Sequence, residues 1–332
     1  MKLKALLLGS AAALIAVSGA HAADAVVAEP EPMDYVKVCD MYGAGFFYIP
    51  GTETCLRIAG YAQVEYDYSD YSNGGTSTLA GSTQSGAQVE GRVTFLAQSE
   101  TDYGTLASFL RLDGSESQVS GANVSTAVDV SNTWISLGNL SMGHREHRAA
   151  LAALPGGPFD GNDQNLGDAY YIDYTFAANG MSATFGGGAT ENTPDIGNVY
   201  LRLDYAGSMY NLAASITHVG HVGVASPGNG DSEQYYNIWG NITPIEGLTI
   251  QGYYNDSSIN NSQRWGIGAS FAVTDSVSVA GGYFDAQRLE KGYFGQVSWA
   301  VTPGLAVTVA AEEKEILGTD ETSFRLRVKR SF

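Results

Sequence analysis

The sequence predicts an all-β protein, a sixteen-stranded antiparallel transmembrane β-barrel with a third loop that folds inward. Three observations predict this fold. Sixteen runs of about ten residues alternate apolar and polar side chains, and the connections between these runs alternate in length. The final run has one apolar face and one cationic face. Side chains on a strand point alternately to opposite faces, so these runs suit strands with lipid outside and water inside.

Residues 1–22 have the features of a secretory signal peptide, which we expect to be absent from the mature protein. Lys2 and Lys4 provide a positive start, residues 6–17 are apolar, and Ala20-His21-Ala22 matches an A-x-A cleavage site. After this segment no apolar run approaches the ~18–20 residues that a membrane-spanning helix needs. We therefore expect an exported chain that no helix anchors.

Residues 23–55 lack the alternating apolar and polar pattern of the rest of the chain. We therefore predict that they form an N-terminal periplasmic leader. The segment contains a Pro/Glu-rich stretch at 28–32 and both cysteines of the chain, Cys39 and Cys55. An even cysteine count in an exported protein favours a disulfide. Such a bond would contribute roughly 3 kcal/mol in the chain-entropy model. Two free thiols remain the alternative.

Residues 56–332 are expected to form the barrel itself. The alternating runs predict strands at 56–68, 86–98, 105–114, 128–137, 140–147, 169–178, 181–190, 198–206, 209–219, 234–243, 248–256, 264–273, 277–285, 291–301, 305–313 and 323–332. The run at 128–137 is ambiguous, because Trp134 and Ile135 compete for the outer face and a bulge would resolve the conflict.

Short turns and longer loops alternate between these strands. The longer connections are predicted at 69–85, 115–127, 148–168, 191–197, 220–233, 257–263, 286–290 and 314–322. Short turns at one end and long loops at the other are typical of an outer-membrane barrel, and an even strand number brings the last strand back beside the first.

The aromatic residues gather toward strand ends, where amphipathic rings would form girdles at the two membrane interfaces. An ordinary core position remains the alternative for each ring. The predicted girdle residues are Tyr66, Tyr68, Tyr170, Tyr174, Tyr205, Tyr210, Tyr253, Tyr254, Tyr293 and Trp299.

The last strand separates its side chains most clearly by parity. Phe324, Leu326, Val328 and Phe332 share one face, and Arg325, Arg327 and Lys329 share the other. If the apolar parity faces lipid, the inward positions of strands 16, 1, 2, 3 and 5 collect cations. This predicted basic wall contains Arg57, Arg92, Arg111, Arg145, Arg325, Arg327 and Lys329. A set of solvated residues without a common purpose is the alternative.

Neighbouring cations repel one another, so a basic wall needs an acidic partner. We expect that partner in the third loop, 148–168, where apolar residues precede Asp160, Asp163 and Asp168. A loop with an apolar patch in an acidic, hydrated chain is expected to fold against an inner wall. Opposed charges across a constriction would produce a transverse field that favours polar solutes.

The residues from Asp34 to Arg57, with the run Tyr42-Gly43-Ala44-Gly45-Phe46-Phe47-Tyr48-Ile49-Pro50-Gly51 at their centre, resemble the N-terminal signature of the alphaproteobacterial general porins. The resemblance implies a trimeric channel in the outer membrane of a Gram-negative bacterium, through which small hydrophilic solutes and ions diffuse passively. It also implies that the third loop folds inward. The last strand, ending at Phe332, would serve as an assembly signal for the barrel-assembly machinery.

Other functions find less support in the sequence. The formal charge of −18, which becomes −20 without Lys2 and Lys4, argues against a nucleic-acid partner. His144 and His147 lack the arrangement of a metalloprotease helix, and no nucleophile elbow surrounds Ser215 or His218. We predict no metal, no cofactor and no enzymatic activity. A barrel with another surface role and a secreted β-rich protein remain alternatives, and ion selectivity stays open.

Overall fold

The computed structural model describes eight stretches of the chain: residues 37–72, 83–119, 125–146, 168–190, 197–220, 233–258, 262–287 and 290–332. The predicted signal peptide lies outside the described residues. So do residues 147–167, which contain Asp160 and Asp163 and nearly all of the predicted third loop. The described residues include one short 3₁₀ helix, η1 (Asp40–Tyr42), and no helix long and apolar enough to cross a membrane.

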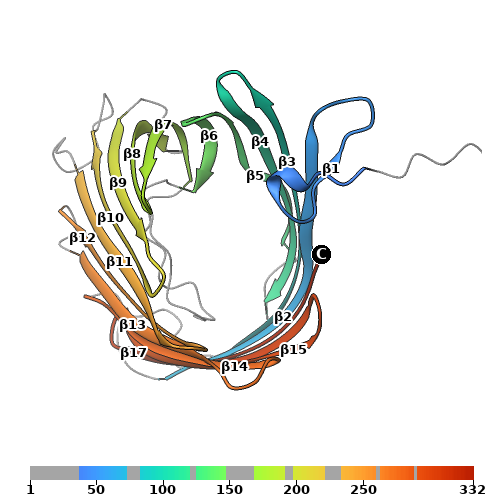
Figure 1. Cartoon of the computed structure of the whole chain (residues 1–332). Coiled ribbons are helices and arrows are strands. Elements are labelled where there is room, and N and C mark those ends of the chain that lie inside the picture. The colour runs from blue at the N-terminus through green and yellow to red at the C-terminus, as the bar shows by residue number, and fades with distance from the viewer. Residues whose placement is uncertain are drawn as a thin grey trace, which may run out of the picture. The chain divides into compact units, whose positions relative to one another are not determined.

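Sixteen strands, β2 to β17, form a closed antiparallel barrel (Figure 1). Each strand pairs with the next along the chain, and β17 pairs with β2 to close the ring. The strands are β2 (Cys55–Tyr71), β3 (Thr83–Thr101), β4 (Gly104–Val119), β5 (Ser125–Leu137), β6 (Leu140–Glu146), β7 (Asp168–Ala178), β8 (Met181–Thr190), β9 (Asn198–Ala206), β10 (Tyr210–Val219), β11 (Glu233–Ile245), β12 (Leu248–Ser257), β13 (Ser262–Ala272), β14 (Val277–Ala286), β15 (Glu290–Thr302), β16 (Leu305–Ile316) and β17 (Thr319–Ser331).

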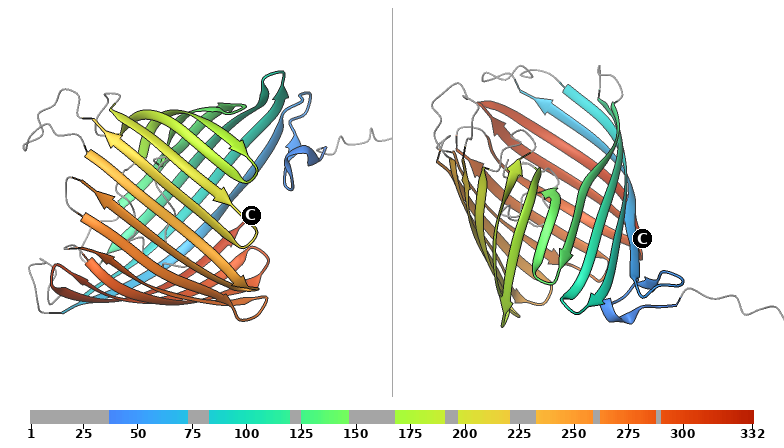
Figure 2. Two further views of the ribbon diagram at one scale, coloured as in Figure 1. Left: turned by 60° about the vertical axis from the view of Figure 1, so that its left-hand side comes forward. Right: turned by 90° about the horizontal axis from the view of Figure 1, so that it is seen from above.

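All sixteen predicted strands are confirmed, but several are longer than the alternation indicated. The predicted loop at 314–322 is wrong: β16 continues to Ile316, β17 begins at Thr319, and Leu317 and Gly318 form a tight turn with φ of 49° and 82°. Beyond the lipid-facing band both faces of a strand are wet, so apolar alternation disappears while backbone pairing continues. Figure 2 shows these strands running obliquely across the barrel.

The two faces of the last strand point as predicted. Phe324, Leu326 and Val328 lie on the outer surface with 51%, 46% and 38% of their area exposed. The side chains of the other parity turn inward, where Arg327 contacts Glu65 of β2. Most of the predicted girdle tyrosines are also exposed on the outside. Tyr253 is the exception, since it is only 8% exposed and belongs to an inner cluster of rings.

A β-bulge resolves the ambiguous run in β5. Arg111 of β4 pairs with Asn132, whereas the next residue, Leu112, pairs with Val130, so Ser131 is an extra residue in β5. The insertion shifts the facing of the strand by one position. As a result Trp134 stacks on the inward ring of Phe109, with 5.4 Å between ring centroids. Its neighbour Ile135 is exposed on the outside.

The barrel closes at a seam between Gly60 and Phe332. The backbone N–H of each residue donates to the carbonyl of the other, with both N···O distances 3.0 Å. A side chain at Gly60 would overlap the backbone oxygen of Arg92 and lie 2.9 Å from the Phe332 ring. The absence of a side chain therefore permits this close approach of strands. Phe332 is 63% exposed on the outer surface.

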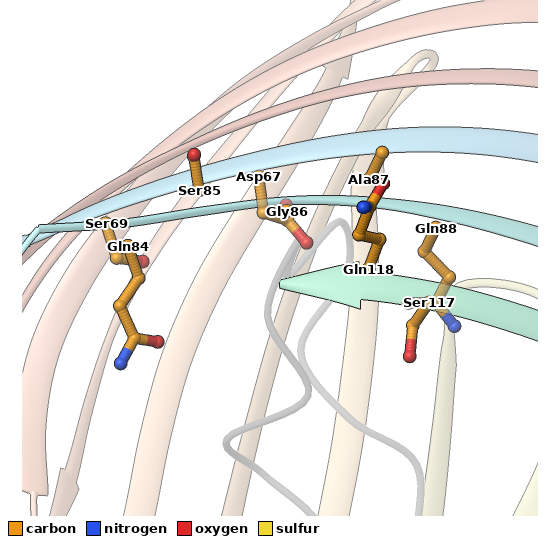
Figure 3. Close-up of a pocket in the computed structure, with 9 residues that line it drawn as sticks. All are labelled: Asp67, Ser69, Gln84, Ser85, Gly86, Ala87, Gln88, Ser117 and Gln118. Carbon is orange, nitrogen blue, oxygen red and sulfur yellow. The ribbon is translucent and has the colours of Figure 1, made fainter. Parts of the chain in front are cut away.

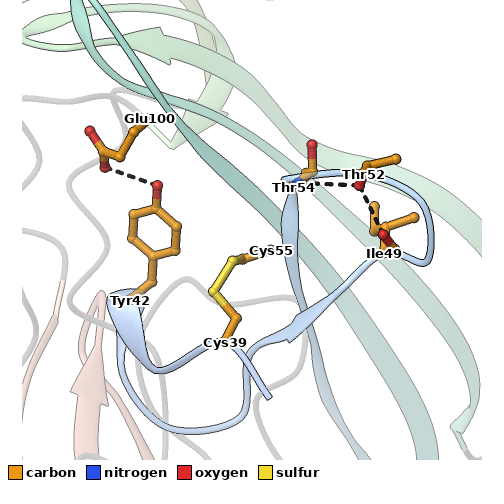
Figure 4. The surroundings of a disulfide bond; sticks show 7 residues. All are labelled: Cys39, Tyr42, Ile49, Thr52, Thr54, Cys55 and Glu100. Atoms are coloured by element: carbon orange, nitrogen blue, oxygen red, sulfur yellow. Dashed lines mark hydrogen bonds between the residues drawn. A yellow bond between two sulfur atoms is a disulfide. The ribbon is translucent and has the colours of Figure 1, made fainter. Parts of the chain in front are cut away.

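Residues 38–54 fold as a small cap on the start of β2. Strand β1 (Phe47–Tyr48) pairs with Cys55 and Leu56. The Cys39–Cys55 disulfide, with Cα atoms 6.0 Å apart, packs with Phe46 in a buried core (Figure 4). The Tyr42 hydroxyl donates to Glu100 of β3 at 2.9 Å. The pKa of Tyr42 is raised to about 12, mainly because its hydroxyl loses contact with water and, to a smaller extent, because of this hydrogen bond.

Candidate channel lining

The inner faces of β17, β2, β3 and β4 form one charged surface, which we call the charged wall. Five of the seven predicted cations gather on it: Arg92, Arg111, Arg325, Arg327 and Lys329. They meet because β17 pairs with β2, so the end of the chain lies beside its first barrel strand. Parity then directs these side chains to the same side of the sheet.

Two arginines of β17 bind carboxylates of β2. The Nε of Arg325 lies 2.6 Å from Asp67 and 3.0 Å from Glu65, and the Nε of Arg327 lies 2.6 Å from Glu65. Asp67 and Glu65 are the register partners of these two arginines across the seam. Glu65 is 4% exposed, so these two ion pairs offset the cost of burying its carboxylate. The seam that closes the barrel is therefore also an ion-paired surface.

Asp113 joins the arginines of the next two strands. It accepts from Arg92 Nε at 2.5 Å and from Arg111 Nε at 2.6 Å. The hydroxyl of Ser131, the bulged residue of β5, also donates to Asp113. A second carboxylate, Glu90, accepts from Arg92 at 3.3 Å. The bulge thus adds a donor to the carboxylate that separates two cations.

Lys329 has a different environment from the arginines. Its ammonium lies 3.8 Å from the centroid of the Tyr61 ring, and the guanidinium of Arg92 lies 5.1 Å from the same centroid. Both are cation–π distances. Among the described residues no carboxylate lies within ion-pair distance of Lys329. The Tyr61 hydroxyl donates to Glu90 at 2.6 Å, which fixes the ring between the two cations.

Among the described residues, the acidic partners of the charged wall lie on the wall itself, and Asp160 and Asp163 of the predicted third loop lie outside those residues. The carboxylates of the wall were not predicted as site residues: they are Glu65, Asp67, Glu90 and Asp113. Residues two apart on a strand share a face, so Glu90 and Arg92, and likewise Arg111 and Asp113, were recognisable as same-face pairs by parity. Asp168 is the first residue of β7 and the register partner of Glu146, so it belongs to a strand rather than to the loop.

Arg57 and Arg145 lie apart from these ion pairs. The guanidinium of Arg57 lies 5.0 Å from the Phe46 ring of the cap. That of Arg145, on β6, lies 5.0 Å from the Tyr171 ring and 5.8 Å from the Trp134 ring. Both cations therefore contact aromatic faces, which provide attraction without neutralising the charge.

A second region of the inner surface is aromatic. Tyr253 of β12, Phe284 of β14 and Phe294 of β15 form a buried group that Trp239 of β11 packs against. We call the first three the aromatic cluster. The residues between them across the sheet are glycines: a Cβ at Gly282 would lie 2.8 Å from the Phe294 ring. The rings thus lie flat on wall positions that lack side chains.

A shallow polar recess lies on the inner side of β2, β3 and β4 (Figure 3). Its volume is about 130 Å³, enough for several water molecules. Amide and hydroxyl side chains supply both donors and acceptors there. The recess begins at Asp67, the partner of Arg325, so it continues the charged wall along the strands. Its lining residues are Asp67, Ser69, Gln84, Ser85, Gly86, Ala87, Gln88, Ser117 and Gln118.

The side chains considered for catalysis do not converge. Ser215 is 7% exposed and points inward from β10, where the amide of Asn237 donates to its hydroxyl at 2.9 Å. His218 has the opposite parity on the same strand and is exposed outside. A serine nucleophile and a histidine base must lie within hydrogen-bond reach, which opposite faces of one strand do not allow.

Comparison with known proteins identifies the family of this barrel. A family model described as "Porin subfamily" matches residues 24–323. Porin Omp2a of Brucella ovis is 34% identical over an alignment that covers 93% of this chain and 97% of that porin. Porin Omp2b of Brucella suis biovar 1 is 36% identical, with 80% of this chain and 78% of that porin covered. The chain belongs to the porin family.

Solved structures support the same fold. The outer membrane channel DcaP of Acinetobacter baumannii superposes with a TM-score of 0.66 at 6% identity, covering 86% of this chain and 99% of that channel. A mutant of Rh. blastica porin gives a TM-score of 0.56 at 14% identity, covering 83% and 100%. This porin is therefore a channel of the Gram-negative outer membrane through which small solutes diffuse passively.

Proposed function

We propose that this porin works as a homotrimer of water-filled pores in outer-membrane lipid, and that the charged wall determines which ions and hydrophilic solutes pass. The observation that carries the proposal is the position of paired charges on the inner face of a closed barrel whose outer face is apolar. Fixed charges lining a pore act on permeating ions at short range. The pore performs no catalysis and binds no cofactor or nucleic acid.

Membership of the porin family supports the homotrimer, because the resemblance to the general porins implies a trimeric channel. Closed cyclic symmetry gives each copy of such a trimer an equivalent neighbour on both sides.

The last strand supports a role in assembly. Phe332 combines two seam hydrogen bonds with an exposed ring on the lipid side. Assembly machinery that engages this strand would hold the edge that must pair with β2. Deleting Phe332 should lower the amount of folded trimer in the membrane, while the surviving channels keep a normal conductance.

Conductance measurement in a planar lipid bilayer tests the proposed function directly. We expect stepwise insertion events, each composed of three equal sublevels, and ohmic current at low voltage. Heat-modifiable migration in detergent gels should accompany the activity, because a closed barrel resists unfolding without heating. Folded protein that inserts but conducts no ions would contradict the pore, and single-level channels would contradict the homotrimer.

A further inference from the structure

The arginines of the charged wall bind their carboxylates mainly through Nε. Arg327 donates from Nε to Glu65 at 2.6 Å, and Arg111 donates from Nε to Asp113 at 2.6 Å. Each of these contacts leaves the two terminal nitrogens without a recorded partner among the described residues. The terminal nitrogens of a guanidinium form a planar fork with parallel N–H donors. The wall therefore holds Arg327 and Arg111 through Nε and leaves the terminal nitrogens of these two arginines available as donors.

The neighbouring carboxylates have little capacity left to use those donors. Glu65 already accepts from Arg327 and Gln63 and forms an ion pair with Arg325. Glu90 already accepts from the Tyr61 hydroxyl at 2.6 Å and from Arg92 at 3.3 Å. Over the described residues of the charged wall, five cations face four carboxylates, and Lys329 is the cation without an ion-pair partner. The surplus in this part of the wall is of donors and positive charge.

Lys329 adds an ammonium to this surplus. Its nearest recorded contact is the π face of Tyr61, which attracts a cation without supplying a hydrogen-bond acceptor. Arg92 contacts the same Tyr61 ring, and Arg327 lies two residues away on the same face of β17. The side chain of Arg327 is 31% exposed and that of Arg92 is 28% exposed. These two cations beside Lys329 are therefore accessible from the lumen.

We propose that Lys329 and Arg92, which face the Tyr61 ring, and Arg327, two residues from Lys329 on the same face of β17, form a binding site for small oxyanions on the permeation path. A guanidinium fork matches two oxygens of a carboxylate or phosphate, and the ammonium supplies a second point of contact. The acidic total of the chain does not oppose this, since charges beyond a Debye length of ~8 Å at physiological salt are largely screened. The inference rests on the proposed function, because it assigns a ligand class to the pore.

Inorganic phosphate is the probe in a planar-bilayer experiment on the full-length folded channel. Chloride current is recorded at neutral pH while phosphate replaces part of the chloride at constant ionic strength. We expect a saturable decrease in conductance, because bound phosphate occupies the chloride path. Lys329→Met should raise the half-blocking phosphate concentration about threefold, as expected for one lost exposed charge contact.

Variants of Tyr61 test whether the position of the two cations matters for phosphate block, or only their charge. Tyr61→Leu removes the ring that holds both cations and should weaken phosphate block without changing any charge, whereas Tyr61→Phe keeps the ring and should retain most of it. Lys291→Met is the matched control, since Lys291 is 52% exposed and pairs with Glu315 away from the charged wall. Each variant is first checked for heat-modifiable migration, and Lys329→Gln replaces any Lys329→Met protein that does not fold.

The outcomes distinguish this inference from the proposed function. A wild-type channel that conducts chloride but is insensitive to phosphate would overturn the oxyanion site and leave the pore intact. Equal block of wild type and both Lys329 variants would overturn the assignment of these residues. A protein that conducts nothing would instead contradict the proposed function.

Discussion

The charged wall and the aromatic cluster line the same barrel in opposite ways. On β17, β2, β3 and β4, long side chains project inward and are held by ion pairs such as Arg327–Glu65. On β12, β14 and β15, rings lie flat over strand positions that are glycine, as Phe294 does over Gly282. The charged wall is held together by contacts between long side chains. The aromatic cluster instead needs glycines, because a side chain at those positions would occupy the space of the rings. One backbone geometry thus supports both a polar and an apolar lining.

The difference shows what each surface can contribute to permeation. Paired charges keep donors and acceptors available to a passing ion, so we expect the charged wall to act on permeation through electrostatics. The aromatic cluster is nearly buried, with Tyr253, Phe284 and Phe294 each 7–8% exposed, so its role is to pack the wall. Variants of the two regions should therefore affect different measurements.

The largest expected effect comes from placing a charge on the lipid side of the charged wall. Leu326→Arg should cost about 2–4 kcal/mol near the midplane and impair membrane insertion. Arg327→Ala, one residue away on the inner face, should assemble well and change conductance. Folded yield from membranes measures the first effect and bilayer current the second. The reverse pattern would mean that the register of β17 is off by one residue.

A smaller loss of stability is expected when a side chain is added at a glycine beneath the aromatic cluster. In Gly282→Ala the new Cβ would lie 2.8 Å from both the Phe294 ring and the Ile267 carbonyl oxygen. Overpacking of this kind costs typically 1–3 kcal/mol, so the unfolding midpoint in denaturant should fall. Gly295→Ala is the control, because nothing lies within 4 Å of its new Cβ. Equal destabilisation of the two variants would show that the ring is not held in this way.

Asp113 offers a test on the charged wall that should change selectivity more than stability. Asp113→Asn removes the negative charge between Arg92 and Arg111 and should shift the reversal potential in a salt gradient toward anions. Arg327→Ala should shift it toward cations, and Asp275→Asn, in an exposed turn, should leave it unchanged. An unchanged potential in both wall variants would contradict the assignment of this wall to the ion path.

The smallest effect on the barrel is expected from the cap. Cys39→Ser combined with Cys55→Ser removes the disulfide, yet β1 still pairs with β2 and Tyr42 still donates to Glu100. We expect loss of rigidity in residues 38–54, seen as faster amide exchange, with an unchanged thermal transition of the barrel. Labelling of both thiols in wild-type protein from membranes would contradict the bond itself.

Sequence alone predicts the lipid and lumen faces well wherever the alternation of side chains is strict. Arg325 and Leu326 could be assigned because lipid enforces a period of two along the strand. The turn at Leu317 could not, since strand ends outside the membrane carry no such pattern. The rule also fails at Tyr253, whose aromatic type suggested a girdle, and at Trp134, which an extra residue turns inward.

The candidate site was predicted in its cations but not in its pairing. Parity placed Arg92, Arg327 and Lys329 on one wall, because each assignment needs only a single strand. The partners across strands depend on register, and no signal in one sequence reveals that Arg325 meets Asp67 over a separation of 258 residues. Only the same-strand pairs, such as Arg111 with Asp113, were accessible by counting.

The glycines beneath the rings of the aromatic cluster limit how the inner surface of the barrel can change during evolution. A ring such as Phe294 and the glycine beneath it form one unit, so a mutation that enlarges Gly282 is tolerated only after the ring has become smaller. Glu65 and Asp113 of the charged wall each bind two arginines, and either arginine can be lost while the other keeps its partner. Homologous channels should therefore vary one residue at a time along β17 to β4, and by correlated pairs along β12 to β15.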